Sequence, residues 1–137
     1  MKTKRIFFIL LTLLLATLAL SACTGGRRIV ASGWAGVTTD EETAYLAYNT
    51  HVYAIDLATG NERWRYPDEA DPAITFYAPP ALTDDGQLIV GGYDNTLYSL
   101  NPDNGQLNWT FEGAEGRYIG GPLVTEEGIF AGTTDHK

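Results

Sequence analysis

Cysteine, histidine and basic residues are scarce in this sequence. Its 137 residues contain 1 Cys, 2 His and 9 Lys+Arg against 17 Asp+Glu, which gives a formal net charge of −8. A single cysteine excludes an intrachain disulfide and a zinc site built from cysteines. His51 and His136 are isolated, with no second histidine four residues away, so they support neither a zinc site nor a nucleophilic triad. The excess of acidic residues argues against binding to nucleic acid phosphates.

Glycine, proline and aromatic residues, by contrast, are plentiful. The chain has 15 Gly, 6 Pro, 3 Trp, 8 Tyr and 5 Phe. Aromatic residues favour strands, and glycine and proline are typical of tight turns. Together with the length of the chain, this composition predicts one turn-rich, all-β domain.

The first 22 residues have the composition of an export signal. Residues 1–5 carry three positive charges, and residues 6–20 are apolar apart from two threonines. This order predicts a secretory signal peptide. An uncleaved membrane helix is one alternative, but the apolar run is shorter than the roughly 20 residues that a span needs. An ordinary signal peptide followed by a chance cysteine is the other.

The single cysteine ends this segment, in the sequence Leu20-Ser21-Ala22-Cys23. The tetrapeptide resembles the bacterial lipobox, whose cysteine carries a diacylglyceryl group and becomes the first residue after cleavage. The resemblance implies a signal peptide over residues 1–22, a lipidated tether over residues 23–33, and a protein anchored on the periplasmic or extracytoplasmic face of a bacterial membrane. Without residues 1–22 the chain has 6 basic and 17 acidic side chains, a net charge of −11. The lipid on Cys23, not protein charge, must then provide the attachment.

A repeat of 45 residues organises the rest of the chain. Residues 37–67 align without a gap on residues 82–112, and a third, shorter match begins at Pro122. Repeats of this length predict stacked supersecondary units, and units made of short strands predict the four-stranded blades of a β-propeller over residues 34–137. The identical pairs are Thr38 and Thr83, Asp40 and Asp85, Tyr48 and Tyr93, Tyr53 and Tyr98, Gly60 and Gly105, and Trp64 and Trp109.

The expected strands and turns follow from local patterns. In residues 62–66 and 107–111 an aromatic residue recurs at every second position from the tryptophan, and polar residues lie between. This period of two predicts strands with one buried and one solvent-exposed face. Leu88-Ile89-Val90 is continuously apolar and predicts a strand in the middle of a packed sheet. Turn signals rich in Asp, Asn and Gly separate these segments. They lie at residues 56–60, 83–86, 94–95 and 101–105.

Residues 54–64 resemble the tryptophan-docking motif of the pyrroloquinoline quinone (PQQ)-like β-propeller repeat family, and residues 99–109 form a looser second copy. The resemblance implies antiparallel four-stranded blades, of which this chain would hold about two and a half. Because a propeller typically closes with 4 to 8 blades, we expect residues 1–137 to be the N-terminal part of a longer protein. The motif positions are Ala54, Asp56, Thr59, Gly60 and Trp64 in the first copy and Ser99, Asn101, Asn104, Gly105 and Trp109 in the second.

The motif tryptophans are expected to be structural. A tryptophan on an outer strand can bury roughly 150 to 250 Å² against the neighbouring unit. Trp64 and Trp109 are therefore predicted to join successive blades and not to take part in catalysis. Trp34 lies outside the motif, and no role is assigned to it.

Other candidate binding, catalytic and metal-ligating residues have less support from the sequence. Phe76-Tyr77, in the long connection between residues 67 and 79, is either an exposed aromatic anchor for a partner or packing between blades. A pair of catalytic carboxylates at Asp68-Glu69, with Asp71 nearby, is conceivable, but a solvated loop is preferred. Four further aspartates offer oxygen ligands that suit calcium, but their spacing does not match an EF-hand and hairpin turns use the same residues. They are Asp84, Asp85, Asp94 and Asp103.

The sequence thus predicts no catalytic residue, metal site or cofactor. The favoured function is a lipid-anchored, non-enzymatic scaffold of the cell envelope that binds another envelope protein or a small ligand, as the resemblance to BamB-type lipoproteins implies. The alternative implied by the family is the N-terminal part of a PQQ-dependent dehydrogenase, with quinone and calcium on the propeller axis. Those enzymes often stack the quinone on a vicinal disulfide, which Cys23 alone cannot form. An extracellular sensor of a signalling protein is disfavoured, because a lipid anchor cannot carry a signal across the membrane.

Overall fold

A computed structural model describes residues 36–135, which form ten β-strands and no helix. No helix in this part of the chain is long and apolar enough to cross a membrane. The expected signal peptide, the lipobox with Cys23, the tether, Trp34 and His136 lie outside the described residues.

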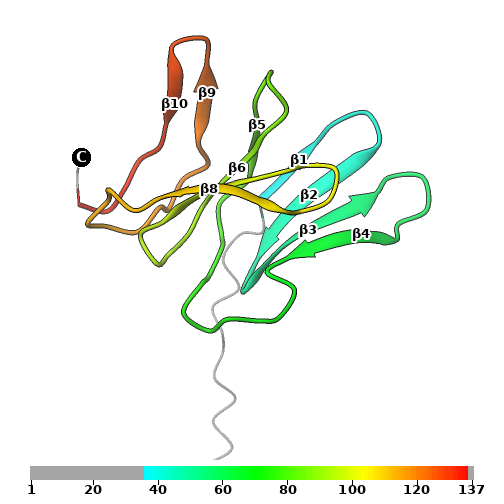
Figure 1. Cartoon of the computed structure of the whole chain (residues 1–137), viewed down its shortest axis with the longest axis horizontal. Helices are drawn as coiled ribbons and strands as arrows, with labels where there is room; N and C mark the ends of the chain where they lie inside the picture. Colours follow the sequence, from blue (N-terminus) through cyan, green and yellow to red (C-terminus); the bar gives the residue numbers. More distant parts are fainter. Residues whose placement is uncertain (1–35, 136–137) are drawn as a thin grey trace, which may run out of the picture. The chain divides into compact units, whose positions relative to one another are not determined.

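The first four strands form one antiparallel sheet in the order β1-β2-β3-β4, which we call blade 1 (Figure 1). The next four form a second antiparallel sheet, blade 2, in the order β5-β6-β7-β8. These two sheets confirm the prediction of all-β, four-stranded blades. Blade 1 consists of β1 (Gly36–Thr39), β2 (Thr43–Tyr48), β3 (His51–Asp56) and β4 (Glu62–Tyr66), and blade 2 of β5 (Ala81–Leu82), β6 (Leu88–Gly91), β7 (Leu97–Leu100) and β8 (Leu107–Phe111).

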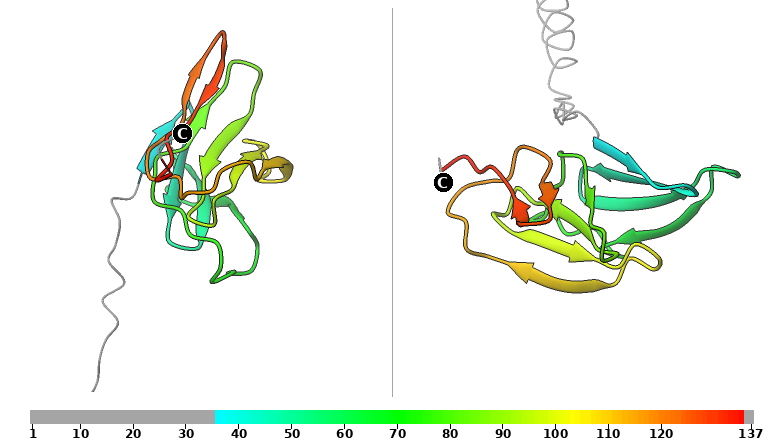
Figure 2. Two further views of the ribbon diagram at one scale, coloured as in Figure 1. Left: turned by 90° about the vertical axis from the view of Figure 1, so that its left-hand side faces the viewer. Right: turned by 90° about the horizontal axis from the view of Figure 1, so that it is seen from above.

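The third unit begins with a hairpin of β9 (Leu123–Thr125) and β10 (Gly128–Phe130). Figure 2 shows this hairpin beside blade 2, where β9 approaches β5. Among the described residues, no strand follows β10.

The two blades repeat each other in detail. Strands β1, β2 and β4 each begin 45 residues before β5, β6 and β8. The register shift between Ala54 and Ile55 recurs between Ser99 and Leu100. The predicted period therefore describes the backbone as well as the sequence.

The main core lies between blades 1 and 2. Strand β6 is buried along its whole length, which confirms the prediction for Leu88-Ile89-Val90. Strand β8 is more exposed than its counterpart β4, whose Trp64 and Tyr66 pack in the core between the blades. The buried residues of the core are Tyr45, Ala47, Val52, Ala54, Trp64, Phe76, Leu88, Val90, Tyr98 and Leu100.

The connection between the blades contributes to this core through Phe76. Its backbone N–H donates to the carbonyl of Asn49 at 2.7 Å, and its ring meets Tyr98 edge-on, with 5.4 Å between the ring centroids. Phe76 is fully buried, so the packing interpretation is right for it and the exposed-anchor interpretation is wrong. Tyr77 is half-buried and keeps a surface toward solvent.

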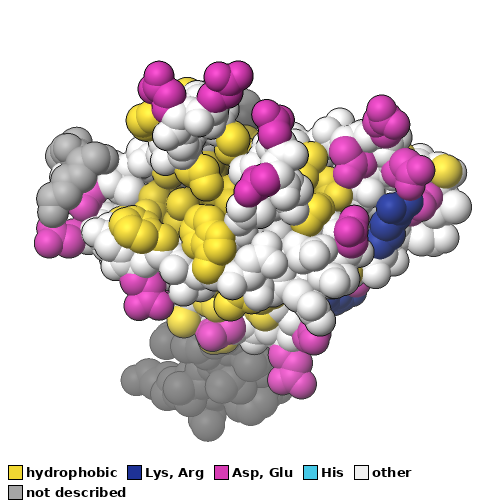
Figure 3. All heavy atoms as spheres, turned by 45° about the horizontal axis from the view of Figure 1, so that its top comes forward, with side chains coloured by type: hydrophobic (Ala, Val, Ile, Leu, Met, Phe, Trp, Pro, Cys, Tyr) yellow, Lys and Arg dark blue, Asp and Glu magenta, His cyan; other side chains and the backbone are white. Residues whose placement is uncertain are grey.

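The blades present two different ends. At one end, which we call the connection face, lie the turns at residues 49–50 and 92–96 and the connections at residues 67–80 and 112–122. At the other, the tip face, lie the turns at residues 40–42, 57–61, 83–87, 101–106 and 126–127. Figure 3 shows acidic side chains standing at hairpin tips around an apolar surface. The exposed acidic residues of these tips include Asp40, Glu41, Glu42, Asp84, Asp85, Asp103, Glu126 and Glu127.

Candidate functional site

The tryptophan of the first motif copy lies between the two blades. Trp64 is 9% exposed, and its indole Nε1–H donates to the carbonyl of Pro102 at 2.8 Å. Gly105 lies against the same ring, since a Cβ at this position would stand 2.6 Å from an indole carbon. Blade 1 therefore docks its tryptophan on the β7–β8 turn of blade 2.

The other residues of this motif copy shape the strand and turn that position Trp64. Ala54 is fully buried on β3 and pairs with Trp64 across the sheet. Asp56 accepts hydrogen bonds from the backbone N–H and the hydroxyl of Thr59, both at 2.8 Å. Gly60 has a φ of 72° and donates its N–H to the carbonyl of Asp56 at 2.8 Å. Such a left-handed conformation favours glycine.

Asp56 also forms an ion pair with Arg63, with 2.6 Å between Oδ2 and Nη2. The hydrogen bond from Arg63 lowers the pKa of Asp56 from 3.8 to about 2, with help from Thr59. A carboxyl group whose pKa is lower in the folded state stabilises the fold above its ordinary pKa, and this contribution disappears as the pH falls toward the folded-state value.

We therefore expect Asp56→Asn to be less stable than the parent at pH 6 and to approach the parent at pH 2. Urea unfolding at the two pH values measures the difference. The turn itself should survive, because Asn101 occupies the same position in blade 2 and accepts the N–H of Asp103 at 2.8 Å. An equal stability loss at both pH values would show that the ion pair is not responsible.

The second motif copy is held within its own blade. The Trp109 Nε1–H and the Ser99 hydroxyl both donate to Oε1 of Gln87, at 2.8 and 2.7 Å. Asn104 accepts the backbone N–H of Gln106 at 3.0 Å. Sequence reasoning missed Gln87. The donors Ser99 and Trp109 need an acceptor when they are buried, but nothing in the sequence identifies which residue supplies it.

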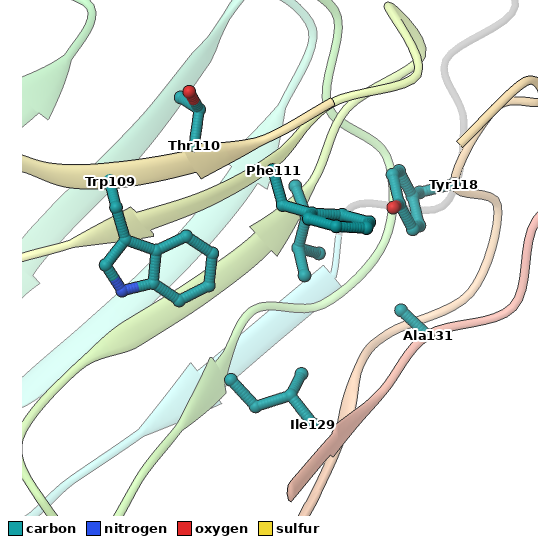
Figure 4. A pocket seen from close by; sticks show the side chains of 7 residues that line it. Trp109, Thr110, Phe111, Tyr118, Ile129 and Ala131 are labelled. Carbon is teal, nitrogen blue, oxygen red and sulfur yellow. The ribbon is translucent and has the colours of Figure 1, made fainter. Parts of the chain in front are cut away.

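An apolar groove opens beside Trp109, between blade 2 and the third unit. We call it the seam groove; its volume is about 440 Å³. In Figure 4 the side chains of Trp109, Phe111 and Ile129 surround a common space, whereas Thr110 points away from it. Phe111 is 54% exposed. The lining residues are Leu97, Trp109, Thr110, Phe111, Tyr118, Ile129 and Ala131.

A second candidate surface lies on the connection face. The rings of Tyr77 and Tyr93 are 4.5 Å apart between centroids, and the Arg117 guanidinium carbon lies 5.7 Å from the centre of the Tyr93 ring. We call these three residues the aromatic cluster. They come from three separate segments: the two connections and the β6–β7 turn. Tyr48, the repeat counterpart of Tyr93, is 42% exposed on the same face.

The four candidate calcium-binding aspartates are spread over both ends of the blades. Asp94 accepts the Tyr98 hydroxyl on the connection face, whereas Asp84, Asp85 and Asp103 belong to the tip face. Asp71 accepts the backbone N–H of Ala73 at 2.9 Å and so shapes a turn. Within residues 36–135 no group of three or more His, Cys, Asp or Glu side chains could hold a metal ion.

Three comparisons with solved or curated proteins bear on this fold. BamB from Moraxella catarrhalis superposes with a TM-score of 0.59 at 21% identity, over 71% of this chain and 29% of that one. A europium-containing methanol dehydrogenase superposes with a TM-score of 0.60 at 18% identity, over 75% of this chain and 22% of that one. The serine/threonine-protein kinase AfsK of Streptomyces griseus is 29% identical over 114 residues, or 78% of this chain and 14% of the kinase.

The two solved structures are β-propellers and show that the described residues have that fold. The chain spans less than a third of the length of any of these three proteins. The family profile described as outer membrane protein assembly factor BamB matches residues 48–137, well over half of the chain. This chain therefore belongs to that family of PQQ-like β-propeller repeat proteins.

Proposed function

We propose that this chain is part of a non-enzymatic binding scaffold of the bacterial cell envelope, anchored through a lipid on Cys23, whose connection face binds another envelope protein. The observation that carries the proposal is the aromatic cluster of Tyr77, Tyr93 and Arg117. The family description, an outer membrane protein assembly factor, supports a protein partner in the envelope.

The composition of the cluster suits protein recognition. Tyrosine and arginine are enriched at protein interfaces and among the residues that contribute most to binding energy. Both rings are half-buried and Arg117 is exposed, so each residue keeps a surface for a partner. Arg117 adds an exposed positive charge to the cluster, which favours a partner with apolar side chains and a carboxylate or backbone carbonyl opposite the guanidinium group.

The cluster is also held rigidly before binding. The Tyr93 backbone N–H donates to the carbonyl of Thr75 at 2.8 Å, and the neighbouring Phe76 is buried between the blades. A surface that is already ordered loses little side-chain entropy on association. The hydrogen bond to Thr75 and the burial of Phe76 thus fix the positions of Tyr77 and Tyr93, although both residues belong to loops.

Cross-linking from defined positions in intact cells tests this proposal. A photo-cross-linking residue at Ile119, which is 58% exposed on the connection face, should form a protein adduct. The adduct should decrease at least about tenfold when Arg117→Glu reverses the charge in the cluster. Leu57, exposed on the tip face, is the matched control position and should give no adduct that depends on Arg117.

The same cells test the anchor. With Cys23→Ser, the protein should no longer incorporate labelled palmitate, because the residue that would carry the lipid has been replaced. An adduct from Leu57 but none from Ile119 would contradict binding at the connection face. Incorporation of labelled palmitate that persists after Cys23→Ser would contradict the lipid anchor.

The alternative, a PQQ-dependent dehydrogenase, makes a different prediction. The described residues do not fit the calcium ion that accompanies the quinone, since their aspartates are spread over opposite ends of the blades. Oxidation of alcohols or sugars by the full-length protein, measured with a dye as electron acceptor after addition of PQQ and calcium, would nevertheless overturn the scaffold proposal.

A further inference from the structure

The β7–β8 turn contains Asn104, the one asparagine of the sequence that is followed by a glycine. Such a pair is chemically reactive, because glycine has no side chain that keeps its backbone nitrogen away from the neighbouring amide. When this nitrogen attacks Cγ of the asparagine, a succinimide ring forms and ammonia leaves. Asparagine is accordingly one of the thermolabile residues of proteins. In blade 1 the equivalent residue is Thr59, which has no amide to lose.

The side-chain amide of Asn104 is accessible and polarised in the folded turn. The residue is exposed, and its Oδ1 accepts the backbone N–H of Gln106 at 3.0 Å. Negative charge develops on this oxygen when a nucleophile attacks Cγ, and an N–H donor that is already directed at the oxygen stabilises that charge. The carbon that is attacked is therefore prepared for the reaction.

The attacking nitrogen, by contrast, is held away from the reaction. The Gly105 N–H donates to the carbonyl of Asn101 at 2.8 Å, and Gly105 is buried against the Trp64 ring. The carbonyl of Pro102 in the same turn accepts the indole N–H at 2.8 Å. The Gly105 nitrogen must leave the Asn101 carbonyl before it can reach Cγ. Because Trp64 holds the turn at both Pro102 and Gly105, ring closure requires the tryptophan to undock.

We propose that Asn104 is a modification site, at which the chain deamidates when the β7–β8 turn opens, and that the product then prevents Trp64 from docking again. The Gly105 nitrogen bonds to Cγ of Asn104, the bond from Cγ to the side-chain nitrogen breaks, and ammonia leaves with the proton of the Gly105 N–H. Water then opens the succinimide at one of its two carbonyl carbons. Cleavage at Cγ gives aspartate, and cleavage at the main-chain carbonyl carbon gives isoaspartate. The proposal concerns the tip face and does not depend on the function proposed above.

Isoaspartate changes the turn in two ways that oppose docking. Its main chain runs through the former side chain, which adds a methylene group just before Gly105, so the Pro102 carbonyl and Gly105 no longer meet the Trp64 ring together. It also adds a carboxylate next to Asp103, which lines a polar pocket between the blades together with Asp40. Like charges at such short range repel each other.

The rate of deamidation tests the link to undocking. Full-length protein is incubated at mildly alkaline pH, and mass spectrometry follows residue 104. The parent should convert at least about tenfold more slowly than a synthetic peptide of residues 101–108, because the folded turn must first open. Trp64→Phe, which keeps a ring but loses the hydrogen bond to Pro102, should convert about fivefold faster than the parent. Trp64→Ala should be faster still.

Two further variants serve as controls for the rate. Trp109→Ala removes the tryptophan of the second motif copy, which donates to Gln87 and not to the β7–β8 turn, so it should convert at the rate of the parent. Asn104→Thr carries the residue of blade 1 and should not convert. Equal rates for the Trp64 and Trp109 variants, a parent that converts as fast as the peptide, or no conversion in any of these proteins would overturn the proposal.

The aged protein tests the consequence for the interface. The isoaspartate form, separated by chromatography, should unfold at a lower urea concentration than the fresh protein, and its Trp64 indole N–H should exchange faster with solvent. Asn104→Asp has the additional charge without the additional methylene group, and should lose less stability. An isoaspartate form that is as stable as the fresh protein, with the Trp64 N–H equally protected, would overturn the proposed effect on docking.

Discussion

Replacing Trp64 by alanine should lower the free energy of unfolding by about 3–5 kcal/mol, the range for deleting a large buried aromatic side chain. Two losses contribute. The indole fills the space between blades 1 and 2, and its N–H satisfies the carbonyl of Pro102 across the interface at 2.8 Å. Urea unfolding followed by circular dichroism measures the effect.

Trp109→Ala is the matched control for this variant, because the two tryptophans occupy the same position of the repeat. Trp109 is only half-buried, so its removal should cost at most about half as much, in proportion to the area withdrawn from water. Trp64→Phe keeps a ring and loses only the hydrogen bond, at a cost of about 1 kcal/mol. Equal losses for both alanine variants would contradict the interblade role of Trp64.

Gly105→Ala should lower the free energy of unfolding by about 2–4 kcal/mol, the sum of two penalties. The residue has a φ of 73°, a conformation that costs an L-amino acid about 1 kcal/mol. The new Cβ would also stand 2.6 Å from the Trp64 ring, and overpacking of this kind typically costs about 1–3 kcal/mol. The comparison of unfolding midpoints and slopes in urea measures the loss.

The repeat provides the control for this variant as well. Gly60 has nearly the same φ, 72°, but nothing lies within 4 Å of a Cβ placed there. Gly60→Ala should therefore cost only the backbone penalty of about 1 kcal/mol. In a Trp64→Ala background, Gly105→Ala should cost no more than Gly60→Ala, because the clash has been removed. A full penalty in that background would show that the indole is not the neighbour of Gly105.

Much of the fold could be predicted from the sequence because the repeat is expressed in local patterns. The 45-residue period, the continuously apolar Leu88-Ile89-Val90 and the glycines at turns each correspond to a feature of the backbone. A glycine before an alternating segment defines a turn and a strand with little influence from the rest of the chain. Predictions of this kind do not require knowledge of what packs on the strand.

The orientation of side chains in the connection at residues 67–80 is harder to predict from the sequence, because it depends on contacts with residues far away in the chain. Phe76 and Tyr77 are adjacent aromatic residues in a segment without regular periodicity. Only the pairing of Phe76 with Asn49 and Gly92 turns one ring inward and leaves the other on the surface. The part of Arg117 in the aromatic cluster is equally hidden, because it comes from a connection 40 residues away from Tyr77.

The third unit shows how a small change in a turn can conceal a correspondence. The sequence of residues 80–86 matches that of residues 122–128. In blade 2 the residue that pairs with Leu82 is Leu88, two positions after the glycine of the turn. In the third unit the residue that pairs with Val124 is Ile129, only one position after the glycine. In an alternating strand such a shift exchanges inward-facing and outward-facing positions. Only the strand pairing shows that Ile129, and not Phe130, takes the place of Leu88.

The docking of Trp64 on the β7–β8 turn can be tested most directly by nuclear magnetic resonance of the indole N–H groups. The structure predicts that the Trp64 N–H exchanges slowly with solvent and that the ring shows a nuclear Overhauser effect to the Hα protons of Gly105, which are shifted upfield by the ring. Trp109, in the open groove, should exchange faster. A Trp64 indole that exchanges like free tryptophan and shows no effect to Gly105 would contradict the account.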